Sequence, residues 1–336
     1  MAVTLKDVAA LAGVSVKTVS NVVNGYSFVK PANRKLVEDA LVATGYRPNI
    51  GARNLRRGRT GFFALMVPEL GIPYFGELAA MIITAAHERD RNVLIEQTWG
   101  QRDLERSTLA SLGPHLVDGA ILSPEALEAE DFALLGPDVP VLMVGEHAVE
   151  ARLDRVAIDN VLAARTAVEH LVRLGRRRIA CIGENPRRGT SAMRLQGYRE
   201  ALADAGMPAD AELVAPAVNY HRRDGAEAMR ALLELPDPPD AVFCFNDMLA
   251  VGALRAAAER GVQVPADLAV VGFDGSEEGA YSTPTLTSIA PDKAAIAERA
   301  VERLTTRIDT GLPHESAFIQ TPFVLEVRES TAGRRA

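Results

Sequence analysis

The stretch TLKDVAALAGVSVKTVSNVVN, residues 4–24, places apolar residues at helical spacing on both sides of a Gly-Val-Ser turn. This recurrence every three or four residues predicts one amphipathic helix before the turn and another after it. Gly13 can end the first helix and Ser15 can cap the second. A third apolar stripe at residues 36–41 predicts another helix. Three short helices with a tight turn between the first two are typical of a helix-turn-helix unit, so we expect an all-α headpiece over residues 1–46.

Charge is distributed unevenly along the chain. Residues 1–60 contain ten lysines and arginines against three acidic residues, a net charge of +7. Because the whole chain carries −7, the remaining residues carry −14. A basic segment joined to an acidic body is typical of a protein that contacts a polyanion through one end. The other interpretation, a solvated basic tail, does not account for the apolar periodicity of the same segment.

The second helix of this unit is the element that would enter the major groove of DNA. Its first residues and its next turn carry side chains able to read bases. Lys17 can donate to guanine, Asn21 can pair with adenine, and Val16 can contact a thymine methyl group. Hydroxyl groups beside them suit phosphate contacts, which orient a protein without reading sequence; they belong to Ser15, Thr18 and Ser20. The alternative is a generic three-helix cap whose polar face is solvated.

Residues 47–60, RPNIGARNLRRGRT, are rich in arginine and poor in residues suited to a core. We expect a hinge or linker here, with one short helix from Asn49 to Arg57. Leu55 lies among arginines, a setting typical of an apolar wedge that enters the minor groove and unstacks a base step. Ala52 is small enough to let two such helices approach each other, or one helix approach the groove.

From Phe62 onward, apolar strand-like runs alternate with amphipathic helical segments. Such alternation predicts parallel sheets with helices on both faces. Nine strand-like runs are better divided between two doubly wound lobes than placed in one. We therefore expect an α/β core over residues 61–336, with crossovers near Asp159–Asn160 and between Asp274 and Pro291. The expected lobes are 61–159 with 291–320 and 160–290 with 321–330.

Polar residues follow several of the predicted strands. In open α/β sheets ligands bind at the carboxyl ends of the strands, so these residues are candidates for an effector cleft. A carboxylate opposite a bidentate arginine can grip a polyol, and Asp274 with Arg194 could provide that pair. The other candidates are Asp159, Asn246 and the aromatic residues Tyr74, Phe75 and Tyr220. Asp274 could instead cap its turn and Asn246 its helix, and the aromatic side chains could simply pack.

Four segments carry a resemblance to a known family: TLKDVAALAGVSVKTVSNVVNG, GYRPNIGARNL, NDMLAVGAL and DLAVVGFDGSE. They resemble the lactose-repressor (LacI/GalR) family of transcription regulators, and the similarity runs through essentially the whole chain. The resemblance implies a homodimer on a near-palindromic double-stranded operator and a hinge helix that folds on DNA. It also implies a core similar to periplasmic sugar-binding proteins, with a small-molecule effector in its cleft. Leu55 matches the family's intercalating leucine, whereas Asn21 stands where familiar members carry Arg or His.

Matching these motifs residue by residue implies two candidate sites. The positions expected to contact DNA are Thr4, Ser15, Val16, Lys17, Thr18, Ser20, Asn21, Asn24, Tyr46, Asn49, Ala52, Leu55 and Arg56. The positions expected to contact the effector are Tyr74, Phe75, Asp159, Arg188, Thr190, Arg194, Tyr220, Asn246 and Asp274. Arg188 and Thr190 match polar contacts used by purine-responsive relatives. Where sugar-responsive relatives carry an Asp after the VPVLMV strand, this chain has Gly145-Glu146.

Two other classes of protein compete with a regulator. A sugar-binding transport protein would share the two-lobed core, but it needs an export signal and has no use for a basic headpiece. An enzyme would carry a motif such as G-x-G-x-x-G, a Walker loop, H-E-x-x-H or G-x-S-x-G, and the sequence contains none of them. We therefore expect no enzymatic activity, no cofactor and no metal site. No apolar run approaches about 18 residues, so we expect a cytoplasmic protein.

These observations predict a repressor of a carbohydrate-related operon. We expect a sugar or sugar derivative in the cleft to release the protein from its operator. The alternatives are a purine- or nucleoside-responsive regulator of the corepressor type, and a solute-binding protein without a DNA role. No apolar heptads follow FVLEVRESTAGRRA, so we expect a dimer rather than a tetramer. Its half-sites should lie about one helical turn of DNA apart.

Overall fold

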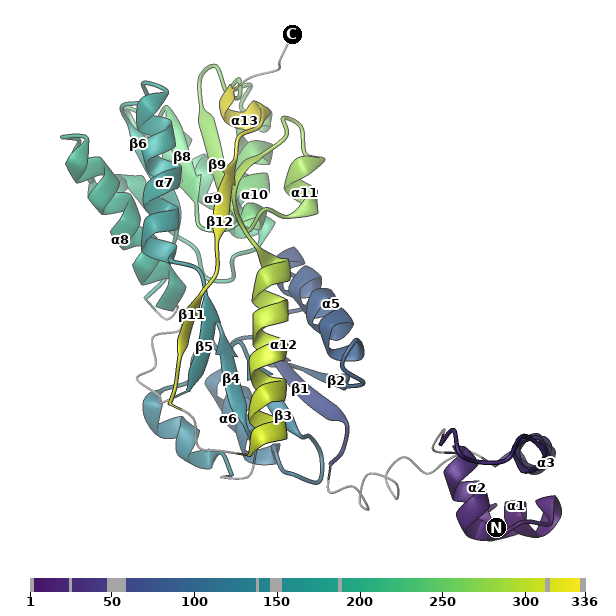
Figure 1. The fold of residues 1–336 in the computed structure, drawn as a ribbon. Helices are drawn as coiled ribbons and strands as arrows, with labels where there is room; N and C mark the ends of the chain where they lie inside the picture. The colour runs from purple at the N-terminus through teal and green to yellow at the C-terminus, as the bar shows by residue number, and fades with distance from the viewer. Residues whose placement is uncertain are drawn as a thin grey trace. The chain divides into compact units, whose positions relative to one another are not determined.

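The computed structural model describes residues 3–23, 26–46, 59–136, 139–145, 153–186, 189–311 and 315–332. The chain divides into two compact units, residues 1–60 and residues 61–336 (Figure 1). Within the described ranges, no helix is long and apolar enough to span a membrane.

The first unit contains the three helices α1 (Leu5–Ala12), α2 (Val16–Val23) and α3 (Pro31–Thr44). Val8, Val19 and Val37, one from each helix, are fully buried and form the centre of its small core. The prediction of a helix-turn-helix headpiece is confirmed. The apolar stripes read from the sequence are the faces that the helices bury against one another.

Local capping determines where these helices begin and end. At the start of α1, the Asp7 amide donates to Thr4 Oγ1 over 3.4 Å and the Thr4 amide donates to Asp7 Oδ2 over 2.8 Å. This reciprocal pairing satisfies amides that a helix start would otherwise leave without partners. Gly13 ends α1 with φ 64°, a conformation that glycine adopts at little cost. The Thr18 amide donates to Ser15 Oγ over 3.1 Å, so Ser15 caps α2 as predicted.

The second unit is built on two six-stranded sheets. The first sheet has the order β11-β5-β4-β3-β1-β2, and all of its neighbouring strands are parallel. Its strands are β1 (Phe62–Val67), β2 (Asn92–Gln97), β3 (Gly119–Leu122), β4 (Val141–Val144), β5 (Asp154–Ala157) and β11 (Phe318–Gln320). Every residue of β3 and β4 is buried, as expected for central strands covered on both faces.

The second sheet has the order β12-β10-β9-β8-β6-β7. Its neighbours are parallel except β12, which runs antiparallel to β10. Its strands are β6 (Ile179–Glu184), β7 (Val214–Pro216), β8 (Ala241–Cys244), β9 (Ala269–Phe273), β10 (Thr287–Pro291) and β12 (Phe323–Glu326). The two sheets define a first and a second lobe, and the predicted two-lobed α/β core is confirmed.

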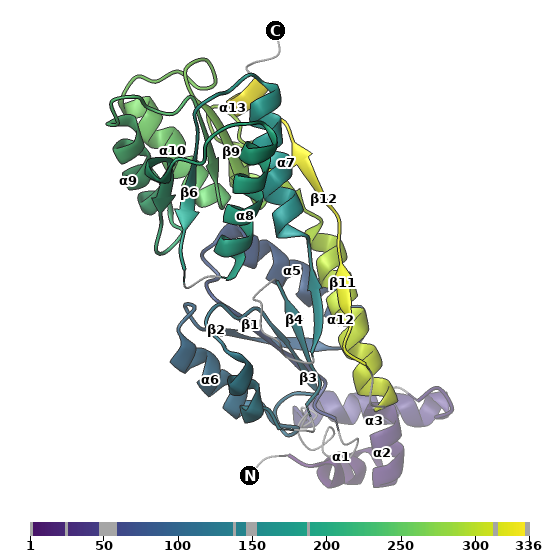
Figure 2. The same cartoon turned by 90° about the vertical axis from the view of Figure 1, so that its left-hand side faces the viewer.

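Helices cover both faces of each sheet (Figures 1 and 2). In the first lobe, α5 (Pro73–His87) and α12 (Lys293–Thr310) lie side by side, and α6 (Arg102–Ser111) packs on the opposite face. In the second lobe, α7 (Asn160–Arg173) pairs with α8 (Gly189–Asp204), and α9 (Arg222–Leu233) pairs with α10 (Asp247–Glu259). Shorter elements are α11 (Glu277–Ala280), α13 (Glu329–Ala332) and 3₁₀ helices at Ala129–Leu134 and Ala211–Leu213.

The chain passes between the lobes three times: from β5 to α7, from β10 to α12, and from β11 to β12. All nine predicted strands are present, but β7, β11 and β12 were not predicted. These three strands have only three or four residues and are mostly half-buried or exposed. They therefore lack the continuous apolar run by which a buried strand is recognised in sequence.

Candidate functional site

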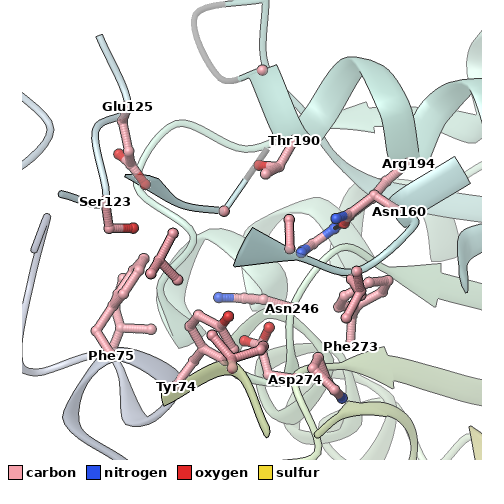
Figure 3. A pocket seen from close by; sticks show the side chains of 18 of the residues that line it. Tyr74, Phe75, Ser123, Glu125, Asn160, Thr190, Arg194, Asn246, Phe273 and Asp274 are labelled. Carbon is pink, nitrogen blue, oxygen red and sulfur yellow. Dashed lines mark hydrogen bonds between the residues drawn. The ribbon is translucent and has the colours of Figure 1, made fainter. Parts of the chain in front are cut away.

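A pocket lies between the two lobes of the core, at the carboxyl ends of their strands. It encloses about 880 Å³, part of it open to solvent. Figure 3 shows its polar side chains, with Ser123 and Glu125 of the first lobe facing Arg194 and Asn160 of the second. This is the position at which open α/β sheets bind small molecules.

Arg194 projects from α8 into the pocket and is held in one orientation by three contacts. Its Nε donates to Asn160 Oδ1 over 2.7 Å, and its Nη1 donates to the carbonyl oxygen of Phe245. Its guanidinium carbon also lies 3.6 Å from the ring centroid of Phe273. A guanidinium over an aromatic face is attracted by the ring's negative potential. Arg194 is therefore already oriented before any ligand arrives.

Asp274 follows β9 and is only 6% exposed. Its φ of 123° is a conformation that residues other than glycine rarely adopt. The backbone is held there because the Asp274 amide donates to the carbonyl of Ile289 over 2.8 Å. Burial raises the pKa of the Asp274 carboxyl to about 8, and the nearby charge of Arg194 opposes that rise. The sequence left open whether Asp274 only caps its turn. In the structure this residue lines the pocket.

Asn246 has the two roles that the sequence left open, because it both caps a helix and lines the pocket. Its Oδ1 accepts the Leu249 amide over 2.8 Å at the start of α10. Its Nδ2 donates to the carbonyl of Tyr220 over 3.0 Å. The Tyr220 hydroxyl in turn donates to the carbonyl of Gly183, so its ring lies in the pocket wall in a fixed position.

The first lobe contributes an aromatic pair and a polar loop. Tyr74 and Phe75, at the start of α5, meet edge to face with ring centroids 5.3 Å apart. The loop after β3 presents Ser123 and Glu125 to the pocket. The fully buried Glu105 of α6 holds this loop, because its carboxylate accepts the Glu125 amide over 2.8 Å and the Ala126 amide over 3.0 Å.

Most residues proposed from the sequence as effector contacts come together in this pocket. Those that line it are Tyr74, Phe75, Thr190, Arg194, Tyr220, Asn246 and Asp274. Asp159 does not line it, and that expectation is corrected: its Oδ1 accepts the Leu162 amide over 2.9 Å and caps α7. The adjacent residue, Asn160, occupies the pocket wall instead. Arg188 lies outside the described residues.

Sequence reasoning did not find four further polar or aromatic lining residues, Ser123, Glu125, Asn160 and Phe273. Ser123 and Glu125 follow a predicted strand, so the same strand-end signal that selected Asp274 could have found them. Asn160 is buried and accepts a hydrogen bond from Arg194. This contact between two helices could be found only from the fold.

The residues proposed to read DNA bases lie along α2 of the headpiece, from its first residue to Asn21. Val16 and Lys17 are exposed, whereas Thr18, Ser20 and Asn21 are half-buried. Ser15 and Thr4 remain exposed while they cap their helices. Tyr46 is half-buried and packs against the headpiece core. The proposed contacts Asn24, Asn49, Ala52, Leu55 and Arg56, and the predicted hinge helix, lie outside the described residues.

Comparison with known proteins shows similarity along almost the whole chain. The profile described as bacterial regulatory proteins, lacI family, matches residues 4–49, and that of a periplasmic binding protein-like domain matches residues 168–331. The transcriptional regulator DegA of Bacillus subtilis is 34% identical over 339 residues, covering 99% of each chain. The chain belongs to the LacI family of bacterial regulators. It is a DNA-binding transcriptional regulator and not an enzyme.

Other members of the family are similarly related. The transcriptional repressor CytR of Escherichia coli is 35% identical over 301 residues, 89% of this chain and 88% of that protein. The ribose operon repressor of Escherichia coli is 32% identical over 327 residues, 96% of this chain and 98% of that one.

Two solved structures are informative. The lac repressor dimer bound to operator and the anti-inducer ONPF has 27% identity and a TM-score of 0.86, covering 99% of this chain and 100% of that one. The complex of the regulator CelR with cellobiose has 34% identity and a TM-score of 0.72, covering 98% of this chain and 99% of that one.

Proposed function

We propose that this regulator is a repressor that binds a near-palindromic operator as a homodimer, and that a neutral sugar in the interlobe pocket releases it. The exposed start of α2, with Val16 and Lys17, supports base reading in the major groove. The basic charge of the first 60 residues supports contact with the phosphate backbone. Because the operator is part of the bacterial chromosome, the proposal places the protein in the cytoplasm.

The proposed class of effector rests on the chemistry of the residues that line the pocket. Asp274 and Arg194 present a carboxyl group and an oriented guanidinium, and Ser123 and Glu125 present oxygens from the opposite side (Figure 3). Adjacent hydroxyl groups of a sugar can donate to carboxylates and accept from a guanidinium at once. The rings of Tyr74 and Phe75 offer apolar faces for the C–H groups of the same sugar.

Comparison with related proteins supports the same class. CelR was solved with cellobiose, and one relative is named as the ribose operon repressor. The ligand would be gripped from both lobes, so its binding favours one arrangement of the lobes over another. An effector that binds one arrangement more tightly shifts the population toward it, and this shift changes operator affinity.

A purine or nucleoside is the second candidate. The flat faces of Tyr74, Phe75 and Phe273 could stack on a base, and Asn160 or Asn246 could pair with its edge. In that case the effector would strengthen operator binding. The two candidates therefore differ in the sign of the response as well as in the ligand.

The experiment is a fluorescence-anisotropy titration of the full chain on a labelled duplex from its own upstream DNA. Ribose, glucose, galactose, cellobiose, adenosine and hypoxanthine are added in turn. We expect one sugar to weaken binding at least about tenfold, which corresponds to about 1.4 kcal/mol of coupling. A purine that strengthens binding would establish the second candidate. Failure to bind any upstream duplex more tightly than unrelated DNA would contradict the proposed operator binding.

The variant Arg194→Ala tests the pocket in the same assay. It should retain operator affinity and lose the response to the sugar, because it removes the oriented guanidinium and leaves the headpiece unchanged. Arg199→Ala, which removes an exposed arginine from the same helix, is the matched control and should keep the response. An Arg194→Ala protein that still responds normally would move the effector site elsewhere.

A further inference from the structure

The loop that carries Asp274 is held by a side chain from outside its own lobe. Lys293, the first residue of α12, donates from Nζ to the carbonyl of Asp274 over 2.8 Å and to that of Gly275 over 3.0 Å. Lys293 is only 9% exposed. A buried ammonium group is costly unless each of its donors has a partner, so these contacts tie the loop firmly to the start of α12.

A carboxylate completes the contact. Glu77 of α5 lies with Oε2 2.6 Å from Lys293 Nζ, and its Oε1 accepts the amide of Glu277 over 3.2 Å. Both side chains come from helices that pack on the first sheet, and they hold residues 274–277 of the second lobe. Figure 1 shows α5 and the start of α12 side by side where the lobes meet, with α11 above them in the second lobe. The Lys293 ammonium group donates to backbone carbonyls of this loop, and the Glu77 carboxylate accepts a backbone amide. The charges of the pair therefore match the polar groups of the loop.

The held loop is part of the effector pocket, while the residues that hold it are not. Asp274 lines the pocket, and neither Glu77 nor Lys293 does. Asp274 also keeps a left-handed φ of 123°, which persists only where surrounding contacts determine the backbone. Its carbonyl contact with Lys293 is one of those contacts. The position of the Asp274 carboxylate in the pocket therefore depends on side chains of the opposite lobe.

We propose that Glu77 and Lys293 form an interlobe clasp that couples ligand contact at Asp274 to the arrangement of the lobes and so to operator affinity. A ligand that displaces Asp274 strains the clasp, and a lobe movement that opens the clasp displaces Asp274. Coupling of this kind is reciprocal between the two sites. The inference rests on the proposed function, because it assigns the regulation of the same pocket.

The first test measures operator affinity without any effector, for Glu77→Gln, Lys293→Met and the double variant of the full chain. The probe is the labelled upstream duplex. Each single variant should change the affinity in the same direction by at least about fivefold, the lower end of typical allosteric couplings. The double variant should change it no more than the larger single variant, because both substitutions open one contact. No change, or additive changes, would overturn the clasp.

A matched control and a conservative variant exclude a loss of folding as the cause. Glu298→Gln removes an ion pair between α12 and Arg89, which lies just after α5; this pair stays within the first lobe, so the variant should leave operator affinity unchanged. Lys293→Arg keeps the charge and should retain most of the wild-type affinity. If Lys293→Arg behaves like Lys293→Met although both proteins are folded, charge pairing is not what the residue supplies, and the clasp is wrong.

Hydrogen–deuterium exchange gives an independent readout. Glu77→Ala should accelerate exchange of the Glu277 amide, since Glu77 Oε1 accepts that amide in the wild type. Unchanged exchange would contradict the proposed contact. If the wild type responds to no sugar, the proposed effector fails, while the effector-free affinities of the variants still decide whether the clasp exists.

Discussion

Asp247 and Asp274 are buried aspartates at or near the pocket, and their pKa values differ from those of ordinary aspartates. Asp247 Oδ1 accepts the Ser288 hydroxyl over 2.6 Å, and its Oδ2 accepts the Ser276 amide over 2.7 Å. Burial nevertheless raises the pKa of Asp247 to about 6 and that of Asp274 to about 8. The folded protein thus retains protons that the unfolded chain, with ordinary aspartates near 3.8, releases.

These two groups should therefore make the free energy of unfolding fall as the pH rises from about 4 to about 8, because at both sites the folded state holds a proton that the unfolded state has released. Asp274→Asn removes the contribution of the group with the higher pKa. This variant should flatten the dependence between about pH 6 and pH 8 and should be more stable than the wild type at the upper end. Urea unfolding across the window, without sugar, measures both slopes. Asp103→Asn, an exposed position, should keep the wild-type slope; the same slope in Asp274→Asn would contradict the assignment.

At the scale of elements, the contact between α9 and α10 positions Asn246 at the pocket wall. The two helices approach closely because glycines face the opposite backbone. A Cβ atom on Gly252 would lie 2.0 Å from the carbonyl oxygen of Arg222, and one on Gly225 would lie 2.1 Å from that of Leu249. Neither backbone oxygen can move without shifting its helix, so any side chain here must separate the pair.

Gly252→Ala should destabilise the core by about 1–3 kcal/mol, the range typical of overpacked sites, although alanine favours helices. Urea unfolding measures the loss. Gly113→Ala is the matched control, because no atom lies within 4 Å of the added Cβ and its φ is not left-handed. The Gly113→Ala protein should be unchanged or slightly more stable. Equal stabilities of the two variants would mean that the helices can separate freely.

At the scale of the whole molecule, the function depends on a basic DNA-binding segment attached to an acidic core. The +7 charge of residues 1–60 favours any DNA, whatever its sequence, because phosphate contacts carry no sequence information. Specific binding needs base contacts and deformation of the operator in addition. The proposed wedge, Leu55, acts on the second of these.

Leu55→Ala should weaken binding to the upstream operator at least about tenfold while changing binding to unrelated DNA by less than about twofold, since only specific binding unstacks the central step. The slope of affinity against salt should stay the same, because no charge is lost. Arg57→Ala is the contrast: it should weaken both complexes and reduce the salt slope by about one. Equal losses on both DNAs for Leu55→Ala would count against insertion of the wedge. Anisotropy titrations at several salt concentrations supply all of these values.

Local patterns were sufficient to predict most elements of this protein, but not the short strands β7, β11 and β12. The apolar spacing of residues 4–24, with a cap at Ser15 and a left-handed Gly13, describes two helices and their turn before any tertiary contact is known. Eight of the nine predicted strands are mostly buried and were recognisable because continuous apolar runs are needed when helices cover both faces of a sheet, whereas β2 is mostly exposed. The strand-end rule then selected Asn246 and Asp274, since that rule depends only on chain direction.

Only the tertiary structure decided which residues the ends of those elements contact. Asp159 and Asn160 are adjacent in sequence, yet the first caps α7 and the second supports Arg194 in the pocket, because α7 and α8 pack with that face inward. The strands β11 and β12 exist only because other strands offer them unpaired edges. The contact of Glu77 with Lys293 and Glu277 joins residues about 200 positions apart, a distance over which no local pattern can act. Sequence periodicity determined the elements because it reflects burial along one helix or strand, whereas the pocket depends on how separate elements pack.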